Sequence, residues 1–176
     1  MSSLARRMLM YPYKLMRRLK SRYYKTVAVL TLGSYDEPLK VHGPTRLTKR
    51  TVLGSNANFN GMTIGGTGRV QIGRNFHSGP ECLIITSFHD YDHGEAIPYG
   101  SASIDRDVEI GDNVWLGSRV TILGGVVLGE GCIVQAGAVV VSDVPAGAIV
   151  GGSPAKVFKQ RDWEHYERLK AAGKFL

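Results

Sequence analysis

Hydrophobic residues recur every six positions between residues 104 and 150. The first residue of each six is aliphatic, with Ala only in the last, and the fifth is small or β-branched. The first positions are Ile104, Ile110, Leu116, Ile122, Leu128, Val134, Val140 and Ala146, and the fifth are Val108, Val114, Val120, Val126, Cys132, Ala138, Val144 and Val150. An α-helix repeats every 3.6 residues and a strand every two, so neither explains this period. The pattern predicts a solenoid whose coils have three short sides, with Gly or Asn at corners that need a positive φ.

The same period continues, more loosely, toward the N-terminus and then breaks once. The fifth positions continue as Ile64, Val70, Phe76, Cys82 and Phe88, and Ile72 and Ile84 hold first positions. The break covers residues 89–103, HDYDHGEAIPYGSAS, which hold three acids, two His, two Gly and one Pro. A solenoid accommodates an insertion as a loop that leaves a corner, and such loops commonly carry function. We therefore expect an inserted loop over residues 89–103.

The segments at the two ends of the chain have a different pattern. Residues 1–25 place apolar side chains three or four apart with Lys and Arg between them, which predicts a basic amphipathic helix, interrupted at Pro12. Its apolar residues are Leu4, Met8, Tyr11, Leu15, Leu19 and Tyr23. Residues 26–157 would form the solenoid. Residues 158–176 would add a short helix over 162–172, with Trp163, Tyr166 and Leu169 on one face, that caps the solenoid or crosses to a neighbour.

The net charge of +7 comes from the N-terminal segment. Residues 1–25 hold eight basic residues and no acid, whereas the other 151 residues hold 14 basic and 15 acidic residues. Two interpretations stay open: the helix rests on an anionic membrane surface, or it packs its apolar stripe on the first coil or a neighbouring subunit. Basic charge without a nucleic-acid-binding module argues against nucleic acid as a partner.

The compartment expected from the sequence is the cytoplasm. Cys82 and Cys132 both occupy fifth positions, where a small core residue is needed, so no disulfide framework is indicated. No run approaches the ~20 apolar residues of a membrane span, and the N-terminus lacks the apolar core of a signal peptide. A peripheral place at the inner face of the cytoplasmic membrane would follow from the first interpretation of residues 1–25.

Three motifs occur together in and after the insertion. They are HDYD at residues 89–92, NVWLGS at 113–118 and GGSPAKV at 151–157. In this combination the chain resembles the hexapeptide-repeat acyltransferases over roughly residues 40–157, and it is most similar to sugar O-acetyltransferases, which include maltose, galactoside and surface-polysaccharide enzymes. The resemblance implies a left-handed parallel β-helix, a homotrimer and acetyl-CoA as donor. The hand comes from the resemblance alone, because parallel crossovers are normally right-handed.

The resemblance also assigns catalytic roles. His89 would be the general base, because an imidazole has a suitable pKa to take the proton of an attacking hydroxyl. Asp92, the last residue of the H-x-x-D motif, would orient the loop or the imidazole and contact substrate. The backbone N–H of Ser118 would stabilise the oxyanion. His93 is the rival base in the same loop, although the family motif does not include it.

Binding residues are implied in the same way. Pantetheine would lie near Trp115, Gly117, Ser118, Ala136 and Gly137, and CoA phosphates would meet Lys156 or Lys159. Asn58 would contact the acceptor sugar. Trp115 could instead form only a trimer contact, and Asn58 could be a corner residue chosen for its conformation. The chain departs from the family at Val141-Ser142-Asp143, where relatives often carry T-K-D, so a Lys that could meet a CoA phosphate is absent.

The function expected from the sequence is acetyl transfer from acetyl-CoA to a sugar hydroxyl of a surface-polysaccharide or lipopolysaccharide precursor. Rival activities are N-acetylation of an amino sugar or nucleotide sugar and acetylation of an antibiotic. A catalytically silent assembly module is the rival outside enzymes. Zinc carbonic anhydrases share this solenoid, but His77 and His89 are twelve residues apart and fall on different sides of a coil, so no metal site is expected.

Overall fold

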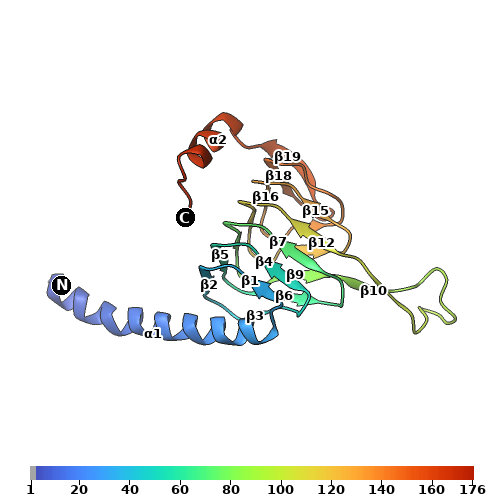
Figure 1. The fold of residues 1–176 in the computed structure, drawn as a ribbon, viewed down its shortest axis with the longest axis horizontal. Helices are drawn as coiled ribbons and strands as arrows, with labels where there is room; N and C mark the ends of the chain where they lie inside the picture. The colour runs from blue at the N-terminus through green and yellow to red at the C-terminus, as the bar shows by residue number, and fades with distance from the viewer. Residues whose placement is uncertain (1–2) are drawn as a thin grey trace.

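A computed structural model describes the backbone of residues 3–176 and the side chains from Lys14 onward. Short parallel strands wind around a three-sided coil, and each side forms one sheet (Figure 1). Side A contains β1 (Ser34–Tyr35), β4 (Thr51–Leu53), β7 (Val70–Ile72), β12 (Val108–Ile110) and β15 (Val127–Leu128). Side B contains β2 (Leu39–Val41), β5 (Ala57–Phe59), β8 (His77–Ser78), β13 (Trp115–Leu116), β16 (Ile133–Val134), β18 (Ala148–Gly151) and an antiparallel edge strand, β19 (Lys156–Gln160). Side C contains β3 (Thr45–Arg46), β6 (Met62–Gly65), β9 (Cys82–Ile85), β14 (Thr121–Leu123) and β17 (Val139–Val140).

The six-residue period explains the core of this stack. Residues eighteen apart lie in register on neighbouring coils, as in Leu116 with Val134 and Ile122 with Val140, so each coil repeats three sixes. The first and fifth residues of the sixes from Val108 to Val144 are buried inside the coil. Cys82 and Cys132 are buried free thiols, as predicted, and burial raises the pKa of Cys132 to about 12. The predicted fold class, a left-handed parallel β-helix with a helix at each end, is confirmed.

The period fails at its two ends, where the sequence pattern was misleading. Ile104, assigned to the first six, lies outside the coil on a projecting strand, where it pairs with Phe88. Phe88 was expected to be buried but is 37 % exposed for the same reason. At the other end Val134 pairs with Val150, sixteen residues on, because the turn near residues 141–143 is two residues shorter than elsewhere. Ala146 is consequently exposed rather than buried.

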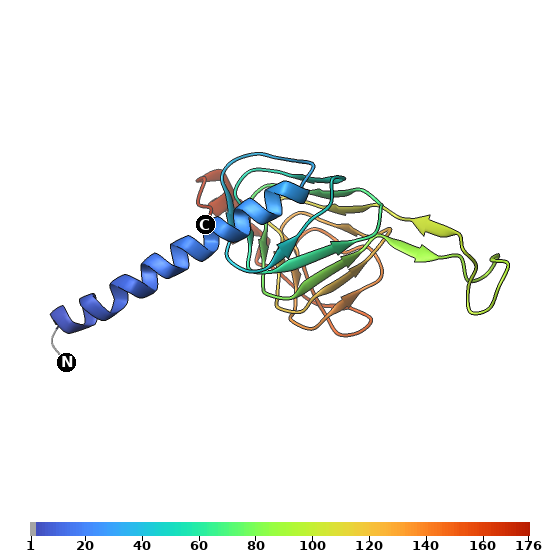
Figure 2. The ribbon, with the colours of Figure 1, turned by 90° about the horizontal axis from the view of Figure 1, so that it is seen from below.

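The expected insertion is a two-stranded arm. Strands β10 (Ser87–His89) and β11 (Ser103–Asp105) pair antiparallel, so His89 and Ser103 belong to strands and the loop proper is residues 90–102. The arm leaves the corner between sides C and A and projects far from the coils in both ribbon views (Figures 1 and 2). At the root of the arm, the Asp105 carboxylate accepts hydrogen bonds from Ser87 Oγ at 2.5 Å and Thr67 Oγ1 at 2.7 Å. These bonds join the arm to the neighbouring coil.

The N-terminal helix differs from its prediction in three ways. Helix α1 (Ser3–Thr31) is continuous through Pro12 and ends six residues beyond residue 25. It packs on the first coil through Ala28, followed by Leu32, and not through the predicted apolar stripe. The stripe members Leu15, Leu19 and Tyr23 are exposed, while Leu4, Met8 and Tyr11 lie outside the described side chains. The helix meets the first coil at its C-terminal end. Ala28 and Leu32 lie at that end and are buried in the core, so their face, and not the predicted stripe, contacts the body.

The C-terminal helix α2 (Trp163–Ala171) agrees with its prediction to within one residue at each end. Asp162 caps it by accepting a hydrogen bond from the His165 N–H at 3.0 Å, which satisfies an otherwise unpaired helix donor. Tyr166 is its buried residue and lies against Gly131 of the stack. Neither helix of the described chain has an apolar stretch sufficient to cross a bilayer.

Candidate active site

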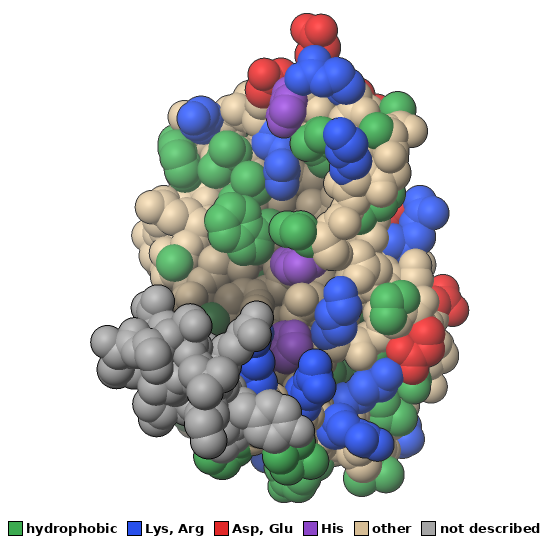
Figure 3. Space-filling model, turned by 90° about the vertical axis from the view of Figure 1, so that its left-hand side faces the viewer, with side chains coloured by type: hydrophobic (Ala, Val, Ile, Leu, Met, Phe, Trp, Pro, Cys, Tyr) green, Lys and Arg blue, Asp and Glu red, His purple; other side chains and the backbone are tan. Residues whose placement is uncertain are grey.

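Side B brings two predicted site residues onto one surface. The register aligns Asn58 on β5 with His77 on β8, and His77 with Trp115 on β13. Strand neighbours of these residues, such as Phe59 and Leu116, are buried, so the three side chains alternate to the outer face. Asn58, predicted for the acceptor, and Trp115, predicted for CoA, are therefore separated by one strand only. Figure 3 views this face and shows histidines along its middle, with Lys and Arg in both the half toward α2 and the half toward α1.

His77 is a candidate site residue that the sequence did not predict. It occupies the same place in Asn75-Phe76-His77 as Trp115 does in Asn113-Val114-Trp115, and that shared place is the signal that could have found it. Burial lowers the pKa of His77, which keeps the imidazole neutral near pH 7 and able to accept or donate a hydrogen bond. Beside it, the Oδ1 atom of Asn58 is buried and has no hydrogen-bond donor among the described residues. A buried amide oxygen of this kind is suited to a ligand hydroxyl.

A cavity of about 360 Å³ lies over β8 and β13. Its floor includes His77 and Trp115, and its outer wall comes from α2 and the residues that follow α2, including Phe175. Arg161 and Lys174 add positive charge to the lining. Trp115 is 53 % exposed there, so a large aromatic surface is free to contact a ligand. Aromatic walls with a few polar groups are typical of a binding site for a small molecule.

The predicted CoA residues meet at the corner where side B turns into side C. Gly117 donates a hydrogen bond to the Val134 carbonyl and Gly137 donates to the Ser118 carbonyl, both at 2.8 Å. The coils approach so closely that a Cβ on Gly117 would lie 2.5 Å from the Ala136 nitrogen. Within the described chain the Ser118 N–H has no acceptor. A fixed, unpaired main-chain donor is what an oxyanion site requires.

Lys156 and Lys159 lie on β19, at the last coil of side B. Lys156 is opposite Gly151, close to the corner that follows β16, whereas Lys159 is opposite Ile149 and farther from it. Both side chains are exposed. They stand on the same side of the solenoid as Trp115, separated from it by β16 and β18.

The arm holds the predicted base and its neighbours. The His89 ring stacks on Tyr99, with centroids 3.9 Å apart and planes 7° apart. Asp90 shapes the turn, because its Oδ1 atom accepts hydrogen bonds from the N–H of Asp92 at 3.2 Å and of His93 at 2.9 Å. This places Asp90, rather than Asp92, in the loop-orienting position. The side chains of Asp92 and His93 are exposed.

One chain does not bring all of these groups together. The arm with His89 leaves the corner between sides C and A, whereas Asn58, His77 and Trp115 face outward on side B. In Figure 1 the arm extends to the right of the coils, whereas the strands of side B lie on the left. A site that contains both His89 and the Ser118 N–H therefore needs the arm of a second copy.

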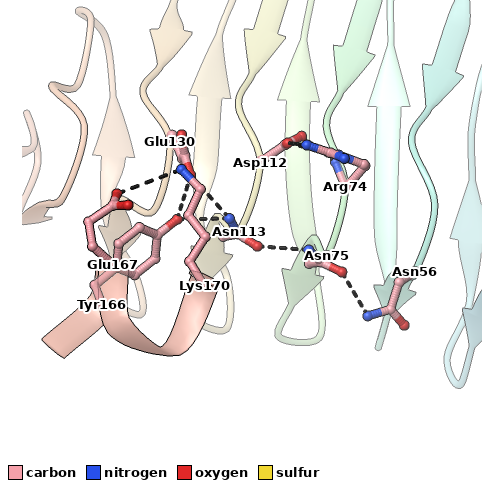
Figure 4. A network of polar contacts seen from close by, with 9 residues as sticks. All are labelled: Asn56, Arg74, Asn75, Asp112, Asn113, Glu130, Tyr166, Glu167 and Lys170. Carbon is pink, nitrogen blue, oxygen red and sulfur yellow. Dashed lines mark hydrogen bonds and ion pairs between the residues drawn. The ribbon is translucent and has the colours of Figure 1, made fainter. Parts of the chain in front are cut away.

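An asparagine ladder fixes the corner that precedes the site strands (Figure 4). Asn56, Asn75 and Asn113 each have a positive φ, between 56° and 61°, which Asn tolerates better than most residues. Their amides bond in sequence, Asn56 Nδ2 to Asn75 Oδ1 at 3.0 Å and Asn75 Nδ2 to Asn113 Oδ1 at 2.8 Å. Each Asn precedes a site residue by two positions, so the ladder sets where Asn58, His77 and Trp115 emerge.

Helix α2 closes the top of this ladder. Asn113 Nδ2 donates to the Tyr166 hydroxyl, which in turn donates to Glu130 Oε1, each at 2.8 Å. Lys170 pairs with the same carboxylate at 2.6 Å. Burial, followed by the hydrogen bond to Glu130, raises the pKa of Tyr166, so its hydroxyl stays protonated. The cavity wall and the floor strands are thus joined through one polar network.

Comparisons with known proteins match this architecture. Residues 107–142 match the family model described as bacterial transferase hexapeptide (six repeats). A solved hexapeptide-repeat-containing acetyltransferase from Vibrio cholerae is 30 % identical, with 74 % of this chain and 73 % of that chain aligned and a TM-score of 0.60. A galactoside acetyltransferase solved in complex with coenzyme A is 28 % identical over 78 % of this chain and 68 % of that chain, with a TM-score of 0.63.

Similarity to curated proteins covers less of each chain. A 2,3,4,5-tetrahydropyridine-2,6-dicarboxylate N-acetyltransferase from Staphylococcus aureus is 58 % identical over 53 residues, which are 30 % of this chain and 22 % of the relative. The chain spans between 22 % and 43 % of the curated relatives it matches. Together with the coil stack and the similarity over three quarters of the Vibrio cholerae structure, these matches show that the chain belongs to the hexapeptide-repeat acetyltransferases.

Proposed function

We propose that this protein transfers the acetyl group of acetyl-CoA to a sugar hydroxyl. The observation that carries the proposal is the row of Asn58, His77 and Trp115 beside the free Ser118 N–H. Amide and imidazole groups bind sugar hydroxyls, and an aromatic face packs on a sugar ring. The similarity to a galactoside acetyltransferase bound to coenzyme A supports both the acceptor class and the donor.

In the proposed reaction the acceptor hydroxyl attacks the thioester carbon directly. The His89 imidazole takes the hydroxyl proton, and the Ser118 N–H stabilises the tetrahedral oxyanion. The C–S bond then breaks, and the imidazolium returns the proton to the CoA sulfur, which releases CoA and the acetyl ester. Asp92 would contact substrate from the same arm. Pantetheine would follow the corner at Gly117, Ala136 and Gly137.

The donor's phosphates need positive charge at the end of the stack. Lys156, beside the corner, and Lys159, farther back on β19, are exposed cations on the correct side of the solenoid. Because Val141-Ser142-Asp143 offers no Lys, these two residues would carry the phosphate contacts. A lysine at either place is a point charge suited to phosphate.

We propose a homotrimer as the working form. Its support is the position of His89, because the arm leaves the corner between sides C and A, whereas Ser118 lies at the corner between sides B and C. Sedimentation equilibrium should give three copies of the 19.2 kDa chain. A monomer that retains full activity would contradict a site shared between copies.

The acceptor proposed is a surface-polysaccharide or lipopolysaccharide precursor, with the enzyme working peripherally at the inner membrane face. Support comes from the basic helix α1, because lipid-linked glycans are assembled at such a surface. A screen of glycan acceptors with labelled acetyl-CoA, followed by mass spectrometry of the product, would identify the sugar and the hydroxyl.

The decisive test of the chemistry is His89→Ala. Loss of a general base should lower kcat by roughly 10²–10⁴-fold while CoA binding in calorimetry is unchanged. His93→Ala is the matched control, since it removes the other imidazole of the arm and should leave kcat within about twofold. Equal turnover of His89→Ala and wild type would contradict the assigned base.

A second candidate is N-acetylation, and the similarity to the Staphylococcus aureus N-acetyltransferase favours it. Matched acceptors separate the two activities: a sugar with a hydroxyl at one carbon and its analogue with an amine there. Turnover of the amine alone would favour N-acetylation. Acetylation of an antibiotic in the same screen, or failure to bind CoA at all, would point to the remaining alternatives.

A further inference from the structure

Helix α1 exposes an apolar stripe on the side that faces away from the coils. The stripe consists of Leu15, Met16, Leu19, Tyr23, Val27 and Leu30, each between 39 % and 69 % exposed. These residues recur at three, four or seven positions, so they share one face of the helix. The opposite face carries Ser21, Ala28 and Tyr24, which contact the body. At ~1.5 Å per residue the stripe is roughly 22 Å long.

Basic side chains border this stripe. At ~100° per residue, Arg18 and Arg22 flank one edge and Lys20 flanks the other. All three are exposed. The helix holds eight basic residues and no acid, and among its side chains from Lys14 onward Lys25 pairs with Glu37 of the body at 2.7 Å. An apolar strip between two cationic borders is the pattern of a helix lying in a membrane interface, with the basic heads reaching the phosphates.

The position of α1 leaves the stripe free to meet a flat surface. The helix lies across the end of the stack, below the first coil, and overhangs the body along most of its length (Figures 1 and 2). Its stripe therefore points away from the solenoid at the pole opposite α2. The arm and side B do not extend below the helix in Figure 1, so they do not obstruct a plane there.

The charge decides between the two occupants that could cover such a face. If stripes of two copies packed together, their basic borders would face one another without an acidic residue on either helix, and like charges repel. An anionic lipid surface supplies the opposite charge and an apolar interior in the same plane.

We infer that α1 docks the protein on an anionic lipid bilayer through the stripe from Leu15 to Leu30, with the first coil toward the membrane. Docking itself does not depend on acetyl transfer. The further statement that the site then faces lipid-linked acceptors rests on the proposed function. In this orientation the solenoid axis stands off the membrane, and the cavity on side B opens along the membrane plane.

The test is co-sedimentation of the full chain with vesicles of phosphatidylglycerol and phosphatidylcholine at 30:70, and with pure phosphatidylcholine. Wild type should bind the anionic vesicles at least tenfold more strongly, and less at high salt. Leu19→Glu and Leu30→Glu should each reduce binding at least tenfold. Ile97→Glu is the matched control, because it places the same acid at an apolar residue that is 99 % exposed on the arm.

Two further measurements make the outcomes decisive. Circular dichroism checks that each variant keeps its helix, and Arg18→Gln/Arg22→Gln should weaken anionic binding with the stripe intact. Wild-type binding by Leu19→Glu, or equal binding to both kinds of vesicle, would overturn the inference. So would sedimentation showing that Leu19→Glu dissociates an assembly, since a second copy would then be the occupant. Acetyl transfer to a soluble acceptor, measured on the same samples, reports separately on the proposed function.

Discussion

The Asn75 side chain does two things that no other residue type does equally well. It occupies a left-handed backbone conformation, with φ of 56°, and its amide bonds both Asn56 and Asn113. The corner before β8 therefore depends on conformation and on hydrogen bonding at one position. A β-helix stacks such corners directly above one another, so an error at one coil is transmitted to the next.

Asn75→Ala should lower the free energy of unfolding by about 2–4 kcal/mol. The variant leaves amide groups of two neighbours unpaired, and it places in the left-handed region an alanine, which tolerates that conformation less well than asparagine does. Asn75→Gly separates these causes, because it restores conformational freedom without the amide and should recover part of the loss. Urea unfolding measures both, and an unchanged midpoint for Asn75→Ala would show that the ladder contributes nothing to stability.

At this scale the sequence predicted some residues of the candidate site and missed others. Asn58, Trp115 and Ser118 lie in short sequence motifs, and their roles were predicted from those motifs. His77 and Tyr166 have no motif of their own. Their roles depend on which coil stacks on which, and the register across the arm joins residues 38 positions apart, a spacing that the six-residue period does not specify.

The arm is an element that stands away from the coils. Its strands pair with each other, and the Asp105 carboxylate at its base is held by the hydroxyls of Ser87 and Thr67. Those hydrogen bonds, from Ser87 first and then Thr67, hold the pKa of Asp105 below its ordinary value. The orientation of His89 therefore depends on a cluster far from the cavity.

Removing that cluster should impair catalysis more than folding. Asp105→Ala should lower kcat by up to about 100-fold through misplacement of the base, with little change in melting temperature. Glu109→Ala, an exposed acid on β12, is the control. Folding lowers the pKa of Asp105. The stabilisation that its carboxylate gives to the root of the arm is therefore complete above the unfolded pKa of ~3.9, and it is lost as pH falls through the folded pKa. Protection of the amides of residues 87–105 from hydrogen exchange, measured relative to an unstructured peptide at the same pH, should fall below about pH 4, and unchanged protection there would contradict this role.

The six-residue period predicts some strand positions correctly and others wrongly. The sixes predicted the strands well where three complete sixes make a coil. They failed at Ile104, which an insertion moved out of the coil, and at Ala146, where a shorter turn shifted the register. Both failures come from local changes in coil length, which leave the periodic residues in place and alter only their partners.

For the molecule as a whole, the period predicted a three-sided solenoid without help, whereas the hand of the coil came from the family resemblance. The distribution of charge was also visible in the sequence. Which face of α1 packs on the body was not, because both faces of that helix carry apolar residues. The structure resolved it through Ala28, which is buried while Leu19 and Leu30 are exposed.

Because the arm and side B face opposite directions, two different inactive chains should restore activity when they assemble together, which is intragenic complementation. A His89→Ala chain keeps a sound side B, and an Asn58→Ala/Trp115→Ala chain keeps a sound arm. Co-expressed at equal levels in a ring where each arm serves the next copy, random mixing would rebuild roughly a quarter of the wild-type sites from two defective parents. Mixtures as inactive as either parent would mean that each chain carries its own complete centre.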